Sequence, residues 1–162
     1  MRQILFRAKR IGRIDGFCYR SQYQNGDWVY GLITKQYSLE WQDKLYDEMT
    51  DIYGVSGIEI DRETVGQFTG FCDKNDKKMF EGDIVKVTYT EQRQYQGVSY
   101  QDEHSCVEEV IYSEKSACFM LKIMCEDIPL YRPLHNFGSQ VNIKELEVIG
   151  NVFDNPELLE EL

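Results

Sequence analysis

The chain has 162 residues, of which 42% are apolar and 13% aromatic, with only three prolines and twelve glycines. This size and composition fit one domain with an aromatic-rich core and exclude a fibrous or disordered chain. The net charge of −10 is unevenly distributed, with −1 over residues 1–90 and −9 over residues 91–162. The acidic C-terminal half opposes binding to phosphate backbones and indicates an acidic, solvated surface.

The first predicted strands surround an Asn-Gly turn. Residues 4–11 are predicted as a strand, with Ile4, Phe6 and Ala8 on one face and Leu5 and Ile11 on the other. Residues 22–24 and 27–33 flank the Asn-Gly dipeptide at 25–26, which suits a type I′ turn because both central residues need a positive φ. One face of the returning strand carries Trp28, Tyr30 and Leu32.

Residues 39–53 allow two interpretations. Leu45, Met49, Ile52 and Tyr53 recur at helical spacing, which is typical of a short helix. The Tyr-Gly dipeptide at 53–54, followed by residues 55–60, instead indicates a turn between two strands. We favour the hairpin and keep the helix as the alternative.

The middle of the chain alternates polar turns with apolar strands. Residues 68–71 and 78–80 flank the turn cluster DKND at 73–76, and the EGD segment at 81–83 leads into a strand over 84–89. The segment DKNDKK resembles the start of a calcium loop. It lacks the glycine and the glutamate that such a loop needs at its sixth and twelfth positions, so we interpret it as a turn.

The least apolar stretch is EQRQYQGVSYQDEHS at residues 91–105, which predicts a mobile loop or a projecting hairpin. Further strands are predicted over 107–112, 117–124 and 145–153. Asn155 and Pro156 are expected to open a short acidic helix, as its N-cap and its first helical residue.

Together these elements predict a mainly β fold with SH3-like barrel elements and a short C-terminal helix. We expect a single unit over residues 1–162. Alternatively, the chain divides into two small intertwined β subdomains, an N-terminal β part over residues 1–63 and a barrel-like C-terminal part over residues 64–162. The core is expected to include Val65, Phe68, Phe71, Ile84, Val85, Val148, Ile149 and Val152.

Five sequence blocks occur in the order typical of one family. They are ILFRAKRI at 4–11, NGDWVYGLI at 25–33, TVGQFTG at 64–70, DKNDKKMFEGDIV at 73–85 and VIGNVFDNPELL at 148–159. The chain therefore resembles the YopX family of phage and prophage proteins. The resemblance implies a mainly β protein with SH3-like barrel elements, encoded by a phage and uncharacterised in function. Residues 11–24 lengthen the connection between the first strand and the NGDWVYGLI block, and residues 39–53 and 91–105 match none of the blocks.

The lack of a membrane span or signal peptide and the pattern of cysteines indicate a cytoplasmic protein. The resemblance to phage proteins implies that this cytoplasm is that of a bacterial host. No run of about 18 apolar residues is present, and the apolar stretch QILF near the N-terminus is too short for a signal peptide. The cysteines form an odd set without a CxxC pair: Cys18, Cys72, Cys106, Cys118 and Cys125. We expect them to be buried small side chains, with no disulfide and no zinc.

No catalytic pattern stands out. Neither His104, expected to be exposed in the polar loop, nor His135 has a metal-binding partner at HExxH-type spacing. Ser105 and Cys106 follow His104, but adjacent residues of an extended chain face opposite sides, which disfavours a catalytic cysteine. The acidic pairs at 108–109, 126–127 and 160–161 are interpreted as solvated. We predict no catalytic, cofactor-binding or metal-binding residue, and no cofactor.

Three functions are compatible with these residues, and we favour a non-catalytic module that binds an unidentified protein and forms a homo-oligomer. Tyr95 and Tyr100 in the polar segment are the expected contacts. The second is a nucleic-acid-binding SH3-like barrel, which the net charge disfavours. Its basic residues would be Arg2, Arg7, Lys9, Arg10 and Arg13. The third is an enzyme with an unrecognised site of carboxylates near His135.

Overall fold

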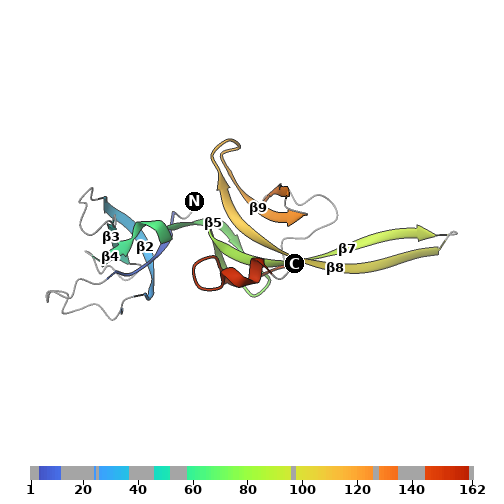
Figure 1. The fold of residues 1–162 in the computed structure, drawn as a ribbon, viewed down its shortest axis with the longest axis horizontal. Helices are drawn as coiled ribbons and strands as arrows, with labels where there is room; N and C mark the ends of the chain where they lie inside the picture. Colours follow the sequence, from blue (N-terminus) through green and yellow to red (C-terminus); the bar gives the residue numbers. More distant parts are fainter. Residues whose placement is uncertain are drawn as a thin grey trace. The chain divides into compact units, whose positions relative to one another are not determined.

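The computed structural model describes residues 4–11, 24, 26–36, 46–51, 58–95, 98–125, 128–134 and 145–160. Antiparallel strands dominate these residues, and the helical elements with described bounds are short 3₁₀ turns (Figure 1). A curled half-barrel sheet and a second sheet hold the strands, so the prediction of a mainly β fold with barrel-like elements is confirmed. The chain forms two compact units, Met1–Phe68 and Thr69–Leu162.

Unit 1 is an antiparallel sheet with a small apolar core. Its strands lie in the order β4-β3-β2-β1, and β1 continues the sheet to β5, Gly66–Cys72. Their bounds are Phe6–Lys9 for β1, Trp28–Gln36 for β2, Tyr46–Asp51 for β3 and Ile58–Asp61 for β4. The 3₁₀ turn Arg62–Thr64 links β4 to β5. The core cluster of this unit consists of Ala8, Val29, Met49, Ile58 and Ile60.

The hairpin favoured for the ambiguous region is present. β3 pairs with β4 from Tyr46 opposite Asp61 to Met49 opposite Ile58. The helical alternative is wrong for residues 46–51, because β3 pairs with a strand on each side and Met49 enters the core, which overrides the helical spacing. The predicted turn at 53–54 lies outside the described residues.

A turn precedes β2 at the predicted position, while Asn25 and residues 22–23 of the strand predicted before it lie outside the described residues. The N–H of Asp27 donates to the carbonyl of Gln24 at 3.2 Å, and Gly26 has a φ of +86°. In β2 the core takes Val29, so the opposite face with Trp28, Tyr30 and Leu32 points outward. The strand predicted over residues 4–11 is shorter in the structure: Ile4 is exposed and precedes β1, and Leu5 beside it is buried.

Unit 2 contains a five-stranded sheet, in which the last strand of the chain extends a four-stranded meander. The order β10-β9-β8-β7-β11 places the C-terminal strand beside β7. The bounds are Asp83–Tyr95 for β7, Val98–Ser113 for β8, Cys118–Cys125 for β9, Ile128–Pro133 for β10 and Leu146–Asn151 for β11. The short strand β6, Lys78–Phe80, pairs with β5. The core cluster of unit 2 consists of Met79, Val85, Val87, Val110, Phe119, Leu121, Leu134, Leu146 and Val148.

The predicted polar turn at 73–76 is fixed by the buried carboxylate of Asp73. Its Oδ1 accepts the N–H groups of Asn75 at 2.8 Å and Lys77 at 2.9 Å, and its Oδ2 accepts the N–H of Val148 at 3.0 Å. Burial raises the pKa of Asp73, but the hydrogen bonds from Val148, Lys77 and Asn75 and the charge of Lys77 lower it more, so the pKa lies below its usual value. One side chain therefore joins the turn to β11.

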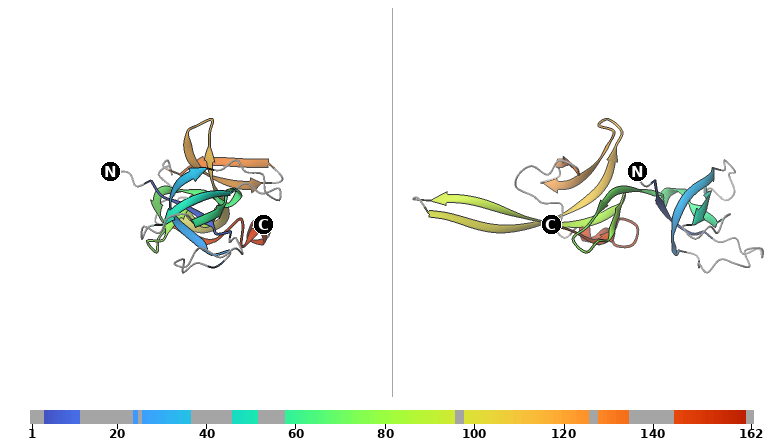
Figure 2. Two further views of the ribbon diagram at one scale, coloured as in Figure 1. Left: turned by 90° about the vertical axis from the view of Figure 1, so that its left-hand side faces the viewer. Right: turned by 180° about the vertical axis from the view of Figure 1, so that it is seen from behind.

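The 91–105 segment is a hairpin, which confirms one of the two predicted alternatives. β7 and β8 pair continuously from Ile84 opposite Glu109 to Tyr95 opposite Val98. Figure 1 and the right-hand view of Figure 2 show these strands running side by side as a long ribbon. His104 therefore lies in β8 and not in a loop. It is half-buried and stacks on Tyr89 with ring centroids 5.6 Å apart.

The end of the chain departs from the prediction at two points. A register shift between Val148 and Gly150 turns Ile149 outward, so its assignment to the core is wrong. A Cβ at Gly150 would come within 2.8 Å of Asn155 Oδ1 and Leu158 Cδ1, which explains the glycine at this bulge.

The other departure is the C-terminal helix, which is a single 3₁₀ turn, Pro156–Leu159. Asn155 precedes it, as predicted, but its side chain makes no capping hydrogen bond. The remaining residues expected in the core are buried or half-buried: Val65, Phe68, Phe71, Ile84, Val85, Val148 and Val152.

Candidate functional site

Exposed apolar side chains gather on the hairpin of β9 and β10. Along β10 the first four residues are all exposed. The large apolar side chains of the hairpin have exposed fractions of 48% for Met124, 62% for Ile128, 49% for Leu130 and 49% for Tyr131. The register places Ile128 and Leu130 on one face of the hairpin and Met124 and Tyr131 on the other. Exposed apolar side chains gathered on one element indicate a binding site.

β10 is an edge strand, yet its free edge is poorly suited to pairing with another strand. The N–H of Leu134 donates to the carbonyl of Phe119 on β9, so even-numbered residues direct their backbone groups to β9. The backbone groups of Pro129, Tyr131 and Pro133 then point to the free edge. Because proline has no N–H, Tyr131 is the only donor among these three residues, and addition of a strand is disfavoured.

The two faces of the hairpin differ in what lies beneath them. On the inner face Leu130 lies opposite Ile123 and Arg132 lies opposite Leu121, which is fully buried in the core. The outer face carries Lys122, whose Nζ lies 3.1 Å from Glu109 Oε2. The apolar surface of the inner face is therefore continuous with the core of unit 2.

Three polar groups lie at the base of this inner face. Arg132 forms an ion pair with Oε1 of Glu108, a side chain with no exposed surface. Cys106 Sγ donates to the same oxygen at 3.0 Å and accepts from Arg132 Nη2 at 3.7 Å. Glu108 Oε2 has no hydrogen-bond partner within the described part of the chain. The interpretation of the 108–109 pair as solvated is wrong for Glu108, because Arg132 from β10 compensates its burial.

This cluster does not activate its thiol. Burial raises the pKa of Cys106, and the nearby Arg132 opposes this rise without cancelling it. A thiol that stays protonated is a weak nucleophile, so the arrangement serves to hold β10 against β8. Cys72 is exposed and Cys118 is half-buried, so the expectation of buried cysteines is wrong for Cys72.

The other residues considered for chemistry are not brought together. Ser105 is exposed while Cys106 packs against the core, as expected for neighbours on opposite faces of a strand. His135 and the acidic pair at 126–127 lie outside the described residues. Within the described ranges, no group of three or more His, Cys, Asp or Glu side chains has the geometry of a metal site.

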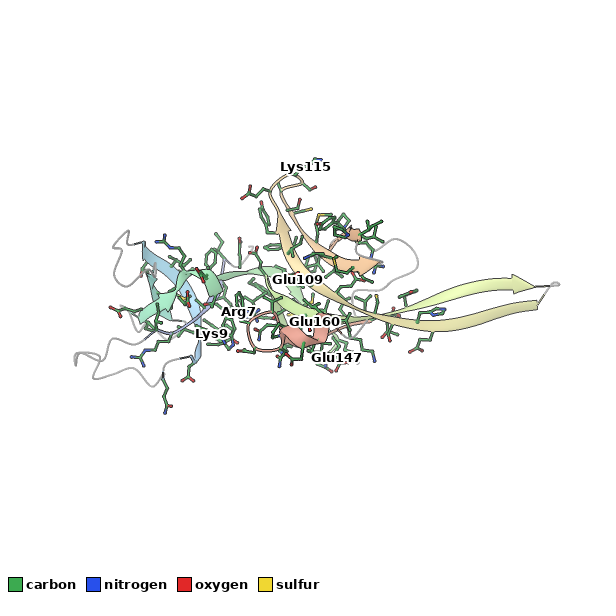
Figure 3. The ribbon with its side chains drawn as sticks, in the orientation of Figure 1. Arg7, Lys9, Glu109, Lys115, Glu147 and Glu160 are labelled. Carbon is green, nitrogen blue, oxygen red and sulfur yellow. The ribbon has the colours of Figure 1, made fainter. Side chains whose placement is uncertain are left out.

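The basic residues proposed for nucleic-acid binding do not form one face. The Arg7 guanidinium is buried and lies 4.7 Å from the centre of the Trp28 ring, with Lys9 Nζ at 5.5 Å from the same ring. Figure 3 labels both side chains in unit 1. Arg10 alternates with them and bridges to Ile60 on β4. Arg2 and Arg13 lie outside the described residues.

Comparison with known families identifies the family to which these blocks belong. The sequence model of the YopX protein family matches residues 6–160. The chain belongs to the YopX family. No curated protein matches this YopX chain. Among the residues described here, no helix of the YopX chain is long and apolar enough to cross a membrane.

Proposed function

We propose that this YopX chain is a phage-encoded, non-catalytic protein of the bacterial cytoplasm that binds another protein through the β9–β10 hairpin. The observation that carries the proposal is the exposure of Met124, Ile128, Leu130 and Tyr131 on one two-stranded element. Covering a half-exposed side chain of this size contributes about 1–2 kcal/mol, so the four together offer roughly 4–8 kcal/mol, against which the cost of association must be set.

The partner is recognised by side chains rather than by strand pairing. Pro129 and Pro133 remove donors from the free edge of β10, while the side chains on both faces of the hairpin stay accessible. The Arg132–Glu108 ion pair supports this mode, because it anchors β10 to β8 and presents the apolar residues on a fixed backbone.

Charge indicates the chemistry of the partner. The sequence joining β9 to β10 is Glu126-Asp127, and residues 91–162 carry a net charge of −9. A surface that combines apolar side chains with lysine and arginine would match it, whereas an acidic surface would be repelled. The same charge distribution opposes the nucleic-acid alternative, since few cations are present to displace counterions.

The test uses affinity capture from host cells with identification of both protein and nucleic acid in the eluates. We expect the double variant L130S/Y131S to lose a protein that the wild type retains. The matched control is L32S, because Leu32 is also an exposed β-strand leucine, at 51%, but lies in unit 1. Equal retention by the double variant, or recovery of nucleic acid in place of a protein, would refute the proposal.

A further inference from the structure

The outward face of β2 in unit 1 carries a stripe of three apolar side chains. Val29 is fully buried in the core of this unit, and Ile33 packs against the same core. Trp28, Tyr30 and Leu32 alternate with them and therefore project from the opposite face of the strand. Trp28 is half-buried, whereas Tyr30 is 36% exposed and Leu32 is 51% exposed. The stripe thus runs from a sheltered indole ring to two side chains in contact with solvent.

Two cations of β1, Arg7 and Lys9, lie against the Trp28 end of this stripe (Figure 3). The guanidinium carbon of Arg7 is 4.7 Å from the centre of the Trp28 ring, and Lys9 Nζ is 5.5 Å from the same centre. In the register of the sheet, Lys9 lies opposite Trp28 and Arg7 lies opposite Tyr30. Side chains of directly paired residues share a face, so the cations stand on the same surface as the stripe.

The backbone beneath these cations is held on both sides. Arg7 pairs with Tyr30 on β2 and with Gly66 on β5. The N–H of Lys9 donates to Thr64 Oγ1 at 2.8 Å, in the 3₁₀ turn that links β4 to β5. Arg7 is buried and Lys9 is half-buried, which restricts the rotamers of both side chains. A partner that binds here meets an arrangement that is already ordered, so less entropy is lost on association.

The charge and the apolar area of this face select different parts of a partner. Each cation is attracted to the negative face of the indole ring, while the two positive charges repel each other. A carboxylate placed at the Trp28 end is attracted by both Arg7 and Lys9, whereas a lysine or an arginine is repelled. At the other end, covering Tyr30 and Leu32 removes apolar surface from water. The face therefore fits a segment that has an acidic residue beside apolar ones.

We propose that the surface formed by Arg7, Lys9, Trp28, Tyr30 and Leu32 binds a protein segment of this composition. The acidic residue of the segment lies against the two cations, and its apolar residues cover the exposed part of the stripe. A single carboxylate needs only these two cations, whereas a phosphate backbone needs more of them. Unit 1 has nine basic and ten acidic residues, so a protein segment fits this face better than a nucleic acid does.

The test probes an array of random short peptides with the fluorescently labelled intact chain and measures the strongest binders by fluorescence anisotropy. We expect the bound sequences to be enriched in an acidic residue next to large apolar residues. Y30S/L32S should weaken the binding of these peptides by about tenfold or more, and K9E should abolish the preference for an acidic residue. The matched control K86E makes the same charge change at an exposed lysine of unit 2 and should bind as the wild type does.

The opposite results overturn the inference. An array without bound peptides, binding that survives Y30S/L32S, or an acidic preference that survives K9E would each exclude this surface. A single-stranded oligonucleotide that displaces the peptides would assign the face to nucleic acid instead. Self-association that is lost in Y30S/L32S would assign it to a second copy of the chain.

Two further measurements separate this surface from other effects. Circular dichroism of each variant shows whether the strands remain folded, so that a loss of binding is assigned to the surface and not to unfolding. The inference does not depend on the β9–β10 hairpin, and L130S/Y131S should leave peptide binding unchanged. Loss of peptide binding in L130S/Y131S would contradict the assignment to unit 1.

Discussion

Replacing Asp73 with alanine should destabilise unit 2 by roughly 2–4 kcal/mol, because three N–H groups lose their acceptor. The N–H of Val148 is buried, and leaving it unpaired costs about 1–3 kcal/mol. Those of Asn75 and Lys77 are partly buried, and water can replace the carboxylate at a cost of about 0.5 kcal/mol each.

The measurement is urea denaturation followed by circular dichroism, because both tryptophans, Trp28 and Trp41, belong to unit 1. Amide hydrogen exchange gives a local readout, since the N–H of Val148 should lose protection in D73A while that of Val29 in unit 1 keeps it. A loss of stability below about 0.5 kcal/mol, or unchanged protection at Val148, would show that the carboxylate does not hold β11.

The same carboxylate gives a pH dependence with a definite sign. The folded pKa of Asp73 lies below its usual value of 3.8, although burial alone would raise it, because the backbone donors and Lys77 stabilise the anion. Its contribution is therefore complete above the unfolded pKa and is lost as the pH falls through the folded value. D73N should lack this part of the acid destabilisation, and parallel pH profiles for the two proteins would contradict the assignment.

Further expectations concern the buried cluster, the bulge and the thiols. R132A should lower the free energy of unfolding by about 2–3 kcal/mol in urea denaturation. This loss is below the 3–5 kcal/mol typical of a broken buried pair, because water reaches the vacated site. The double variant E108L/R132M should recover most of the lost stability. G150A should lose about 1–3 kcal/mol in the same assay, since its Cβ would lie 2.8 Å from two side-chain atoms. In timed alkylation followed by mass spectrometry, Cys72 should react before Cys106, which is half-buried and has a raised pKa.

Local signals in the sequence predicted the local structure well. The turn at 73–76 follows from residues that hydrogen-bond their own backbone. For residues 91–105, the low apolar content and the length allowed a loop or a projecting hairpin, and the hairpin is present. Ile149 was misplaced because a bulge shifts the alternation by one residue, and a bulge depends on contacts with Asn155 and Leu158 that the strand pattern does not contain.

The candidate site depended on long-range pairing that no spacing reveals. Glu108 was assigned to solvent because its compensating Arg132 lies on β10, beyond the whole of β9. The exposed residues of β10 have the same apolar character as those of a core strand, so periodicity alone could not separate binding surface from core. A signal was present in Pro129 and Pro133, whose spacing is typical of an edge strand.

The hydrogen bond from Val148 to Asp73 also orders the steps of folding. The strands β7 to β10 can form by successive hairpins between neighbours in sequence, whereas β11 reaches β7 only after a loop of several dozen residues has closed. We therefore expect the Asp73 carboxylate to gain its third donor after the transition state. Substitutions at Asp73 should then accelerate unfolding and leave the refolding rate almost unchanged, so that the lifetime of the folded unit depends on a contact that contributes little to its formation.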